Sequence, residues 1–362
     1  MNIVYLVYEL INSGPENVLY DICANLDRQK FHPIIVTLRS EIGERSTEGK
    51  FKDLGIEIRH LSFSTIQLEL RTKWVARTIE DSLNDVGDFV IHAHGHHPSL
   101  IASYFKHPSM CTIHCISGED YVIKKGKLLG GYMSWRFKNR LSKIQRPVAI
   151  SDYMRDYYKN YAKDTIATIY NGVTVKPSLE ERGAIRRKLN LEESSYVIVV
   201  IGSVIPRKNT LYIIEQLKQL KDDGIMCLII GNGSDLDASK QMAAGDYRFR
   251  FEGFKNDVSD YLYSADISIS ASRSEGLPLS VLEALNAGIP MLMSDIPPHK
   301  EIETAMDMAC VRTFSLTNNG LLPAFVKMKE QRFDKVLLQK KACELFSAET
   351  MVHEYEKLYA AL

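Results

Sequence analysis

The chain has 362 residues, of which 45% are hydrophobic and 25% are charged, a composition typical of globular proteins and not of disordered ones. This length exceeds what one ordinary hydrophobic core needs, so we expect two domains. The 45 Lys and Arg residues balance 45 Asp and Glu residues, so the overall charge gives no reason to expect nucleic acid as a partner.

Short apolar segments rich in Val and Ile alternate with longer helical patterns. Near-continuous apolar runs are typical of strands covered on both faces, and helices between them make parallel crossovers. A first series of expected strands comprises 2–7, 33–38, 56–60, 88–93, 110–114 and 147–150. A second series comprises 196–202, 226–230, 249–252, 267–271, 291–294 and 310–313, with helices expected at 16–26 and 209–221. The pattern predicts an α/β fold with two doubly wound parallel sheets in tandem.

The two series part after Gly172, where a charged stretch precedes the next strand. We therefore expect a first domain of residues 1–172 and a second of residues 173–345. Residues 346–362 have the pattern of an amphipathic helix with Ser347 as its N-cap. This helix either covers its own domain or crosses back to the N-terminal one.

In open parallel sheets, ligands bind beyond the carboxyl ends of the strands. The most informative segment of this kind is 273–288, RSEGLPLSVLEALNAG. Pro278 suits the first position of a helix, which would leave the amides of Leu279 and Ser280 unpaired at the helix N-terminus. Such amides favour a phosphate group.

Two carboxylates flank this helix start. Glu275 lies in the loop, and Glu283 falls about one turn into the helix. One would accept hydrogen bonds from the hydroxyls of a donor sugar, and the other from a ribose. The plain alternative is a helix whose acidic residues merely stabilise its N-terminal dipole.

The stretch from Glu275 to Glu283, within EGLPLSVLEALNAGIP, resembles the E-x7-E signature of retaining GT-B glycosyltransferases of family four. The resemblance implies two Rossmann-like domains that face a cleft, an N-terminal one for the acceptor and a C-terminal one for the nucleotide-sugar donor. It also implies a reaction that needs neither metal nor cofactor. The likeness covers nearly the whole chain and is strongest from 196 to 300.

The segment IGSVIPRKNT (201–210) is similar to the strand and loop in which the family binds the donor diphosphate through an arginine and a lysine. Lys208 matches that lysine, whereas Ser203 stands where the arginine usually is. Either Arg207, beside Lys208, supplies the missing charge or the site uses only one cation. By resemblance, Lys208 and Glu275 are catalytic.

Other motifs extend the resemblance. Gly231 in IIGNGSDL and Phe254 in FEGF match the turn and the backbone position that contact the nucleoside. In the first domain, SGPEN lies where the family has its phosphate loop, with Gly14 and Glu16 matching. IHAHG is similar to the family's His-x-His strand end, which places His94 in the cleft as a third catalytic residue.

The resemblance implies that a hexose or N-acetylhexosamine is moved from a nucleotide-diphosphate sugar, by family habit a UDP-sugar, to a saccharide or lipid-linked saccharide. The product would be a surface polysaccharide such as a capsule or exopolysaccharide. One alternative is a sugar-nucleotide epimerase of the same fold. Another is a non-catalytic sugar-nucleotide-binding partner subunit, because Ser203 and the SGPEN loop depart from the family pattern.

Two motifs invite a metal interpretation. Alternate histidines in HAHGHH (92–97) share one strand face, but no acidic or cysteine residue lies just beside them in the sequence. Asp235 and Asp237 form a D-x-D at an expected helix start, where acidic residues are common. We expect no metal at either place.

Residues 121–146 contain eight Lys and Arg residues and no Asp or Glu. Leu129, Met133, Phe137 and Leu141 form a stripe with helical spacing. Such a helix either binds an anionic membrane surface peripherally or packs on the core with a solvated basic face.

The six cysteines lack any CxxC spacing, which indicates a reducing compartment and neither a disulfide framework nor a zinc site. The first residues, MNIVYLVYEL, have no basic segment and do not resemble a signal peptide. We therefore expect a cytoplasmic protein, with the inner face of the cell membrane as a peripheral location.

Overall fold

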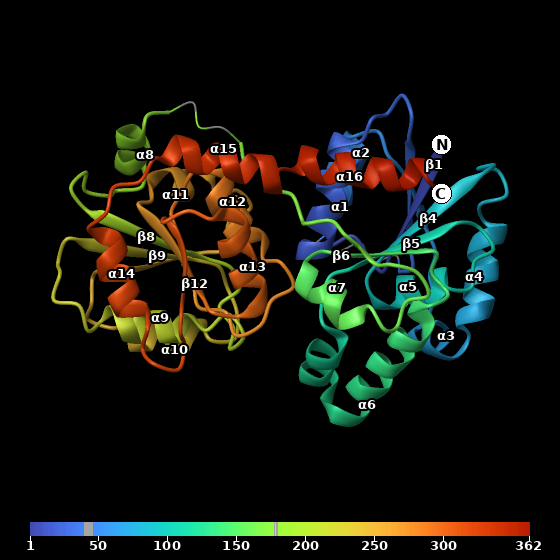
Figure 1. Cartoon of the computed structure of the whole chain (residues 1–362), viewed down its shortest axis with the longest axis horizontal. Coiled ribbons are helices and arrows are strands. Elements are labelled where there is room, and N and C mark those ends of the chain that lie inside the picture. Colours follow the sequence, from blue (N-terminus) through green and yellow to red (C-terminus); the bar gives the residue numbers. More distant parts are fainter. Residues whose placement is uncertain (40–45, 177, 179) are drawn as a thin grey trace. The chain divides into compact units, whose positions relative to one another are not determined.

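The computed structural model describes residues 1–39, 46–176, 178 and 180–362, apart from the side chains of residues 119, 123 and 124. The chain divides into two compact units. The first unit contains Met1–Gly172 and Ala348–Leu362, and the second contains Val173–Ser347. Each unit has a parallel sheet covered by helices (Figure 1), which confirms the predicted α/β fold.

The sheet of the first unit has seven strands in the order β3-β2-β1-β4-β5-β6-β7. Every neighbouring pair is parallel. The strands are β1 (Asn2–Val7), β2 (His32–Thr37), β3 (Glu57–His60), β4 (Phe89–His94), β5 (Ser109–Ile113), β6 (Arg146–Ala149) and β7 (Ala167–Thr168). The predicted strands of this series are all present with their ends shifted by at most one residue. The two-residue β7 was not predicted, because it is too short to carry an apolar pattern.

The helices of the first unit are α1 (Gly14–Asn25), α2 (Glu48–Asp53), α3 (Thr65–Leu70), α4 (Thr72–Asp81), α5 (His96–Ala102), α6 (Ser117–Leu141), α7 (Asp152–Tyr158) and α16 (Ala348–Ala360). The C-terminal helix α16 packs against α1 (Figure 1). Its Tyr359 hydroxyl lies 2.7 Å from Nδ1 of His92 and 3.1 Å from the hydroxyl of Tyr5. The Tyr355 hydroxyl lies 2.9 Å from Thr112 Oγ1. Buried hydrogen bonds thus fix the last helix of the chain to the first sheet.

The sheet of the second unit has six parallel strands in the order β10-β9-β8-β11-β12-β13. They are β8 (Tyr196–Ile201), β9 (Ile225–Ile230), β10 (Phe249–Gly253), β11 (Ile267–Ser270), β12 (Met291–Ser294) and β13 (Val311–Phe314). The central strand β8, YVIVVI, is almost entirely buried, as a strand covered on both faces should be. Apolar side chains of β8, β9, α9 and α14 form one core cluster.

The helices of the second unit are α8 (Arg182–Lys188), α9 (Thr210–Leu217), α10 (Leu236–Met242), α11 (Ser259–Ser264), α12 (Leu279–Asn286), α13 (Pro297–Met306), α14 (Leu321–Lys329) and α15 (Lys335–Phe346). The chain enters and leaves this unit at one place. Val173 and Ser347 form a parallel bridge, and the Val173 amide donates to the Phe346 carbonyl at 3.0 Å. Among the described residues, no helix combines the length and the apolar character that crossing a membrane requires.

Candidate functional site

Two glycine turns lie at the carboxyl ends of the adjacent strands β8 and β9. A Cβ atom at Gly231 would lie 1.9 Å from the carbonyl oxygen of Gly202, and one at Gly233 would lie 2.3 Å from that of Val204. The Val204 amide donates to the Asn232 carbonyl at 2.9 Å. Since no larger side chain fits between the two turns, glycine at these positions brings the loops after β8 and β9 into direct contact.

Lys208 and Arg207, in the loop after β8, both reach Glu275, in the loop after β11. Lys208 Nζ lies 2.6 Å from Glu275 Oε1, and Arg207 Nη1 lies 2.6 Å from Oε2. Arg207 Nη1 also donates to the Ser274 carbonyl at 2.7 Å. The Glu275 side chain is 7% exposed, whereas that of Arg207 is 34% exposed. The cluster therefore combines one buried carboxylate with two cations and is positively charged overall.

The pKa of Glu275 shows which influence dominates in this cluster. Burial by itself would raise the pKa, but the charges of Lys208 and Arg207, with hydrogen bonds from Lys208 and Ser272, lower it to about 2. Glu275 is therefore a carboxylate at any physiological pH. It can accept hydrogen bonds from hydroxyl groups, and it has no proton to give.

Helix α12 follows Glu275 in the chain. The structure places Pro278 at its N-cap and Leu279 as its first residue, which corrects the prediction that Pro278 opens the helix. The ψ angle of Pro278 is 118°, an extended value outside the helical range. The first amides of an α-helix have no acceptor within the helix, so Leu279 and Ser280 still supply the N–H groups of the helix start.

Glu283 lies one turn into α12 and is half-buried. It lines a pocket of about 160 Å³ in the second unit. The other residues around this pocket come from the start of the unit and from the segment before and within α11: Thr174, Val175, Lys176, Asn256, Asp257, Val258, Ser259 and Leu262. A carboxylate that lines an open pocket can accept hydrogen bonds from a bound ligand.

Phe254 directly follows β10 beside the turn of Gly231. The Gly231 amide donates to the Gly253 carbonyl at 2.8 Å, which holds the two strand ends together. The Phe254 side chain is 54% exposed. A large aromatic ring that faces solvent beside a glycine turn offers a flat apolar surface next to exposed backbone groups.

His299, which the sequence analysis did not single out, lies behind the Glu275 cluster on α13. It is fully buried, and its Nδ1 lies 2.9 Å from the Ser294 carbonyl. Burial lowers its pKa to about 4, although the Ser294 carbonyl and the charge of Glu275 act in the opposite direction. Within the described part of the chain its Nε2 has no hydrogen-bond partner. Extending the search for polar residues from the end of β12 into α13 would have found it.

Gly14, in the first unit, opens α1 directly after β1 and its loop. A Cβ atom there would meet nothing within 4 Å, so the backbone of this helix start is accessible. The Ser13 hydroxyl donates to the Glu16 carboxylate. Burial raises the pKa of Glu16, although the Ser13 hydrogen bond lowers it. These residues form a tight polar turn, and the side of the turn at Gly14 is open.

His94 ends β4, next to the end of β5. Its Nδ1 lies 3.0 Å from Nε2 of His114, the residue after β5. His94 is 3% exposed, and burial, with smaller contributions from His92 and His114, holds its pKa well below the usual value. Its Nε2 lacks a partner among the residues described. His92 is buried between Tyr359 and Thr112 and belongs to the core.

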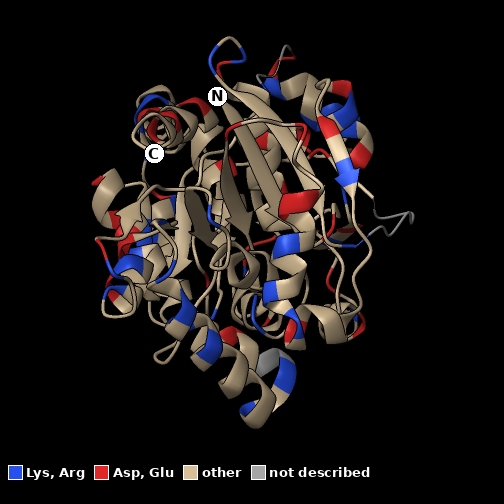
Figure 2. Ribbon diagram, turned by 90° about the vertical axis from the view of Figure 1, so that its right-hand side faces the viewer, with Lys and Arg blue, Asp and Glu red and all other residues tan. Residues whose placement is uncertain are grey.

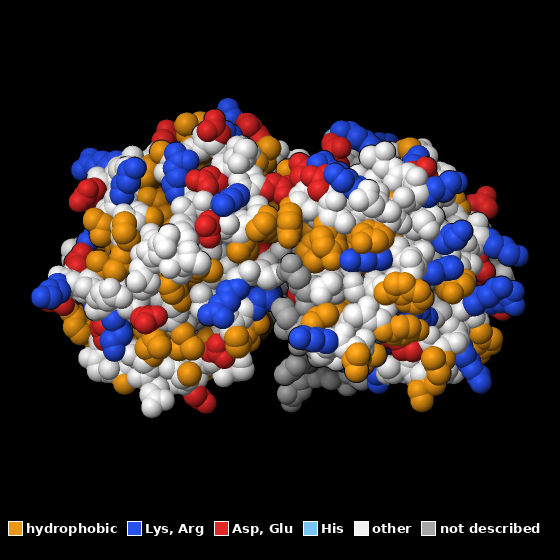
Figure 3. Space-filling model, turned by 60° about the horizontal axis from the view of Figure 1, so that its bottom comes forward, with side chains coloured by type: hydrophobic (Ala, Val, Ile, Leu, Met, Phe, Trp, Pro, Cys, Tyr) orange, Lys and Arg blue, Asp and Glu red, His pale blue; other side chains and the backbone are white. Residues whose placement is uncertain are grey.

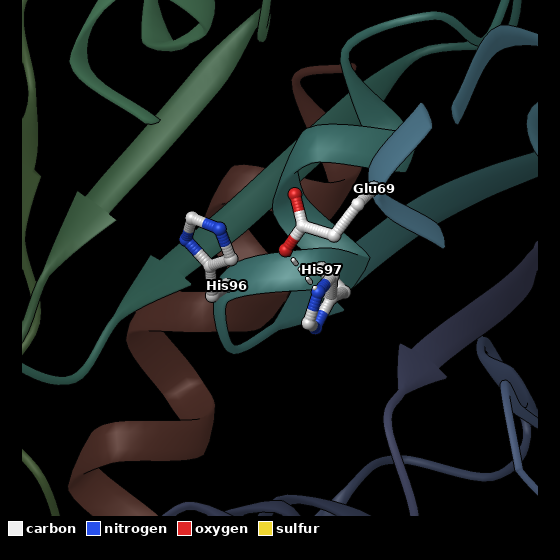
Figure 4. Close-up of side chains that lie close together, drawn as sticks. All are labelled: Glu69, His96 and His97. Atoms are coloured by element: carbon white, nitrogen blue, oxygen red, sulfur yellow. Dashed lines mark hydrogen bonds and ion pairs between the residues drawn. The ribbon is translucent and has the colours of Figure 1, made fainter. Parts of the chain in front are cut away.

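The histidines of α5 have an acidic neighbour from another part of the chain, which the sequence spacing did not indicate. Glu69 of α3 accepts a hydrogen bond from His97 Nε2 at 2.8 Å (Figure 4). Potential ligand atoms of Glu69, His96 and His97 lie within 4.8 Å of one another. Glu69 is also paired with Arg136, and His96 Nδ1 lies 3.0 Å from the Tyr121 hydroxyl. Because a guanidinium already neutralises the carboxylate, this group is a poor fit for a metal cation.

Helix α6 carries the basic stretch and is interrupted at Gly126, where φ is 80°. Of the predicted apolar stripe, Met133, Phe137 and Leu141 are buried, but Leu129 is 53% exposed. Lys and Arg residues recur along this helix, the lowest element in Figure 2. Among its described side chains, the other exposed large apolar ones are Leu128, Tyr132 and Trp135. The helix therefore packs on the core by one face and presents a mixed basic and apolar surface.

Comparisons with known proteins agree with this architecture. The family described as Glycosyltransferase Family 4 matches residues 12–176, and the family described as Glycosyl transferases group 1 matches residues 181–313. A UDP-Gal:alpha-D-GlcNAc-diphosphoundecaprenol alpha-1,3-galactosyltransferase of Escherichia coli is 29% identical over 202 residues. That match covers 51% of this chain, and the chain spans about half, 52%, of that relative's length. An O-antigen biosynthesis glycosyltransferase WclY of Escherichia coli is 26% identical over 68% of this chain and 70% of its own.

Solved structures show the same fold at low sequence identity. Alr3699/HepE of Anabaena, determined in complex with UDP and glucose, superposes with a TM-score of 0.79 at 16% identity, and all of both chains is covered. The sucrose-phosphate synthase of Thermosynechococcus elongatus gives a TM-score of 0.79 at 15% identity, also over both whole chains. The chain therefore has the GT-B fold, and it belongs to the glycosyltransferases by two family matches, Glycosyltransferase Family 4 over residues 12–176 and Glycosyl transferases group 1 over residues 181–313.

Proposed function

We propose that the protein is a retaining, metal-independent glycosyltransferase that moves a hexose or N-acetylhexosamine from a UDP-sugar to a saccharide or lipid-linked saccharide acceptor. The observation that carries this proposal is the cluster of Lys208, Arg207 and Glu275 beside the start of α12. Two cations, two helix-start amides and one ionised carboxylate are the groups that a sugar diphosphate requires.

The cations have a direct chemical task. When the bond between the anomeric carbon and the diphosphate breaks, negative charge grows on the departing phosphate. Lys208 and Arg207, with the amides of Leu279 and Ser280, would stabilise this charge more strongly in the transition state than in the ground state. Arg207 takes the part of the cation that Ser203 does not supply. With these groups on the diphosphate, the proposed reaction has no need of a metal ion.

The retaining course is proposed from the family resemblance, and the role assigned to Glu275 favours a front-face reaction over one with a covalent intermediate. This carboxylate is held by two cations, which makes it a poor nucleophile, and we assign it to the hydroxyls of the donor sugar. The acceptor hydroxyl would then attack from the face that the diphosphate leaves. Its proton passes to the departing phosphate oxygen, the new bond forms between the acceptor oxygen and the anomeric carbon, and the configuration is kept.

The nucleoside has a separate set of candidate contacts in the same unit. We assign the ribose to Glu283, which lines the pocket of about 160 Å³, and the base to backbone groups at Gly231 and Phe254. In the first unit, we assign Gly14 to the donor diphosphate and His94 to the reacting sugars. The neutral state of the buried His94 leaves it one nitrogen to accept and one to donate a hydrogen bond.

The relatives support the choice of donor and acceptor. The galactosyltransferase relative is named for a UDP-sugar donor and a diphosphate-linked lipid acceptor, and a structural neighbour was solved with UDP and glucose. Another relative is named for O-antigen synthesis. We therefore place the protein in surface polysaccharide synthesis on the cytoplasmic side of the membrane, with α6 as a peripheral contact to anionic lipid. Binding to anionic liposomes that moderate salt abolishes would support this contact, and no binding in low salt would exclude it.

The experiment that tests the function is a screen of nucleotide sugars for protection against thermal unfolding, followed by transfer assays with the protective donor. A ligand present at 100 times its Kd stabilises the protein by about 2.7 kcal/mol. Transfer to a saccharide acceptor supports the proposal. Conversion of the donor alone, seen by NMR, would instead show an epimerase, and tight donor binding without any transfer or hydrolysis would show a non-catalytic subunit.

A further inference from the structure

A second pocket, in the first unit, has a different chemical character from the pocket at Glu283. Its volume is about 380 Å³, within the range of small-molecule sites. Its lining comes from the end of α3, from α4, from the segment after α5 and from α6. Its lining consists of Leu70, Arg71, Thr72, Lys73, Trp74, Arg77, Tyr104 and Arg136. Four of these are cations, and no carboxylate is present among the described residues that line it.

Three of the four cations are available to a ligand. Arg71, Lys73 and Arg77 are exposed, and no ion pair joins them to any carboxylate in the described part of the chain. Within one small volume, three unpaired positive charges repel one another and favour an anion. By contrast, the pocket at Glu283 contains both acidic and basic residues, with Lys176 3.4 Å from Asp257.

The fourth cation is fixed in position. Arg136 of α6 donates one bond to Glu69 and another to Thr72, and its side chain is 15% exposed. A guanidinium has five N–H donors, so these two bonds leave others for a ligand. Thr72 is itself held, because its hydroxyl donates to the Leu68 carbonyl at 2.9 Å. The wall formed by α6 therefore presents a preorganised donor.

The rim of the pocket is apolar. Leu70 is 78% exposed and Trp74 is 47% exposed, and both line the pocket. Ile66, one turn before Leu70 on α3, is 70% exposed. Figure 3 shows hydrophobic and basic side chains interspersed on the surface of the first unit. A free inorganic anion gains nothing from such a rim, whereas an anion attached to a hydrocarbon chain buries apolar area against it.

We propose that this pocket binds the phosphate or diphosphate group of a lipid-linked acceptor, with Arg71, Lys73, Arg77 and Arg136 on the anion and Leu70 and Trp74 on the first part of the lipid. This inference rests on the proposed function and narrows its acceptor to a phosphate-linked lipid. In this proposal the pocket also positions the acceptor, because binding of the acceptor's phosphate restricts where its sugar can lie.

The test uses Trp74 as a built-in probe. The chain contains two tryptophans, so the full-length Trp135→Phe variant leaves Trp74 as the single one. We expect farnesyl diphosphate to change the Trp74 emission saturably. Farnesol and inorganic diphosphate should each bind at least about tenfold more weakly, which corresponds to about 1.4 kcal/mol for the missing part of the ligand. An excess of UDP should leave the signal unchanged, because UDP is assigned to the second unit.

Charge variants then locate the binding. In the Trp135→Phe background, Arg71→Gln/Lys73→Gln/Arg77→Gln should weaken farnesyl diphosphate binding at least about tenfold and flatten its salt dependence. The control variant, Lys221→Gln/Lys240→Gln/Lys327→Gln, removes three exposed positive charges from the second unit. It should bind farnesyl diphosphate as tightly as the background does.

Three outcomes would overturn the proposal: no saturable change of Trp74 emission, equal affinity of the triple variant and its background, or equally tight binding of inorganic diphosphate, which would show a site for a free anion. Protection by UDP against thermal unfolding, measured on the same samples, keeps the two proposals apart. If UDP does not protect the unmodified protein, the proposed donor site is contradicted. If UDP still protects the triple variant, the substitutions disturbed only the pocket.

Discussion

Lys208 Nζ lies 2.6 Å from Oε1 of Glu275, a carboxylate that is 7% exposed. The cation assigned to the donor diphosphate is thus held in place by the carboxylate assigned to the donor sugar. Arg207 holds the other carboxylate oxygen at 2.6 Å. Lys208 and Arg207 are thus positioned before the donor arrives. When the donor binds, some of their contacts with Glu275 must be exchanged for contacts with the diphosphate.

Replacement of either member of this pair should impair the reaction strongly. We expect Lys208→Ala and Glu275→Ala each to lower turnover by roughly 10²–10³, the usual effect of losing one preorganised charged contact. Steady-state kinetics with the donor found in the screen would measure this. Lys240→Ala, an exposed lysine of the same unit, is the control and should keep its turnover. Unchanged turnover in both site variants would refute the assignment.

An arginine at position 203 should be able to take over part of the role of Arg207. Arg207→Ala removes one of the two cations at Glu275 and should lower kcat/KM by about tenfold or more, about 1.4 kcal/mol of charge stabilisation. Ser203 is exposed in the same loop, and the family that this chain resembles usually has an arginine at that position. Ser203→Arg added to Arg207→Ala should recover part of the loss. If the double variant is no better than Arg207→Ala alone, Arg207 does not compensate for Ser203.

Glu283 should act on donor binding more than on the chemical step. Glu283→Gln keeps the shape of the side chain and removes the charge, so we expect the Kd for UDP to rise about tenfold or more with a small change in kcat. Isothermal titration with UDP measures the first quantity. Glu215→Gln, the same change at an exposed glutamate of α9 outside the pocket, is the matched control and should keep its UDP affinity. Normal UDP affinity in Glu283→Gln would contradict the ribose assignment.

Buried histidines should make the fold sensitive to mild acid. Burial lowers the pKa of His299 and His114 to about 4, against an ordinary value of 6.5. Between pH 6.5 and 4 the unfolded chain therefore binds protons that the folded chain does not, and the free energy of unfolding falls as the pH falls. His299→Asn should reduce this slope by up to about 1.4 kcal/mol per pH unit, measured by urea unfolding at pH 7, 5.5 and 4.5. A variant with the same slope as the unmodified protein would show that burial does not lower the pKa of His299.

Near-continuous apolar runs predicted the strands closely, because a strand covered on both faces leaves little choice of residue. They could not predict β7, whose two residues carry no pattern. The cap of α12 was also misplaced by one residue. Pro278 fits the first turn by its fixed φ, but its ψ of 118° keeps it outside the helix.

Reasoning from strand ends could predict the candidate site only within one segment, whereas Lys208 and Arg207 were added through the family resemblance. Glu275, Leu279 and Ser280 follow one another in the chain, and strand-end reasoning brings them together. The pairing of Glu275 with Arg207 joins residues 68 positions apart, and that of Glu69 with Arg136 joins residues 67 positions apart. Such contacts depend on how loops and helices pack, which local patterns do not encode.

The structure of the protein with UDP bound tests the proposed donor site most directly. We expect the diphosphate oxygens to lie within hydrogen-bond distance of Lys208 Nζ and of the amides of Leu279 and Ser280, with a ribose hydroxyl on Glu283. Diphosphate density elsewhere on the protein, with the Lys208–Glu275 pair undisturbed, would contradict it.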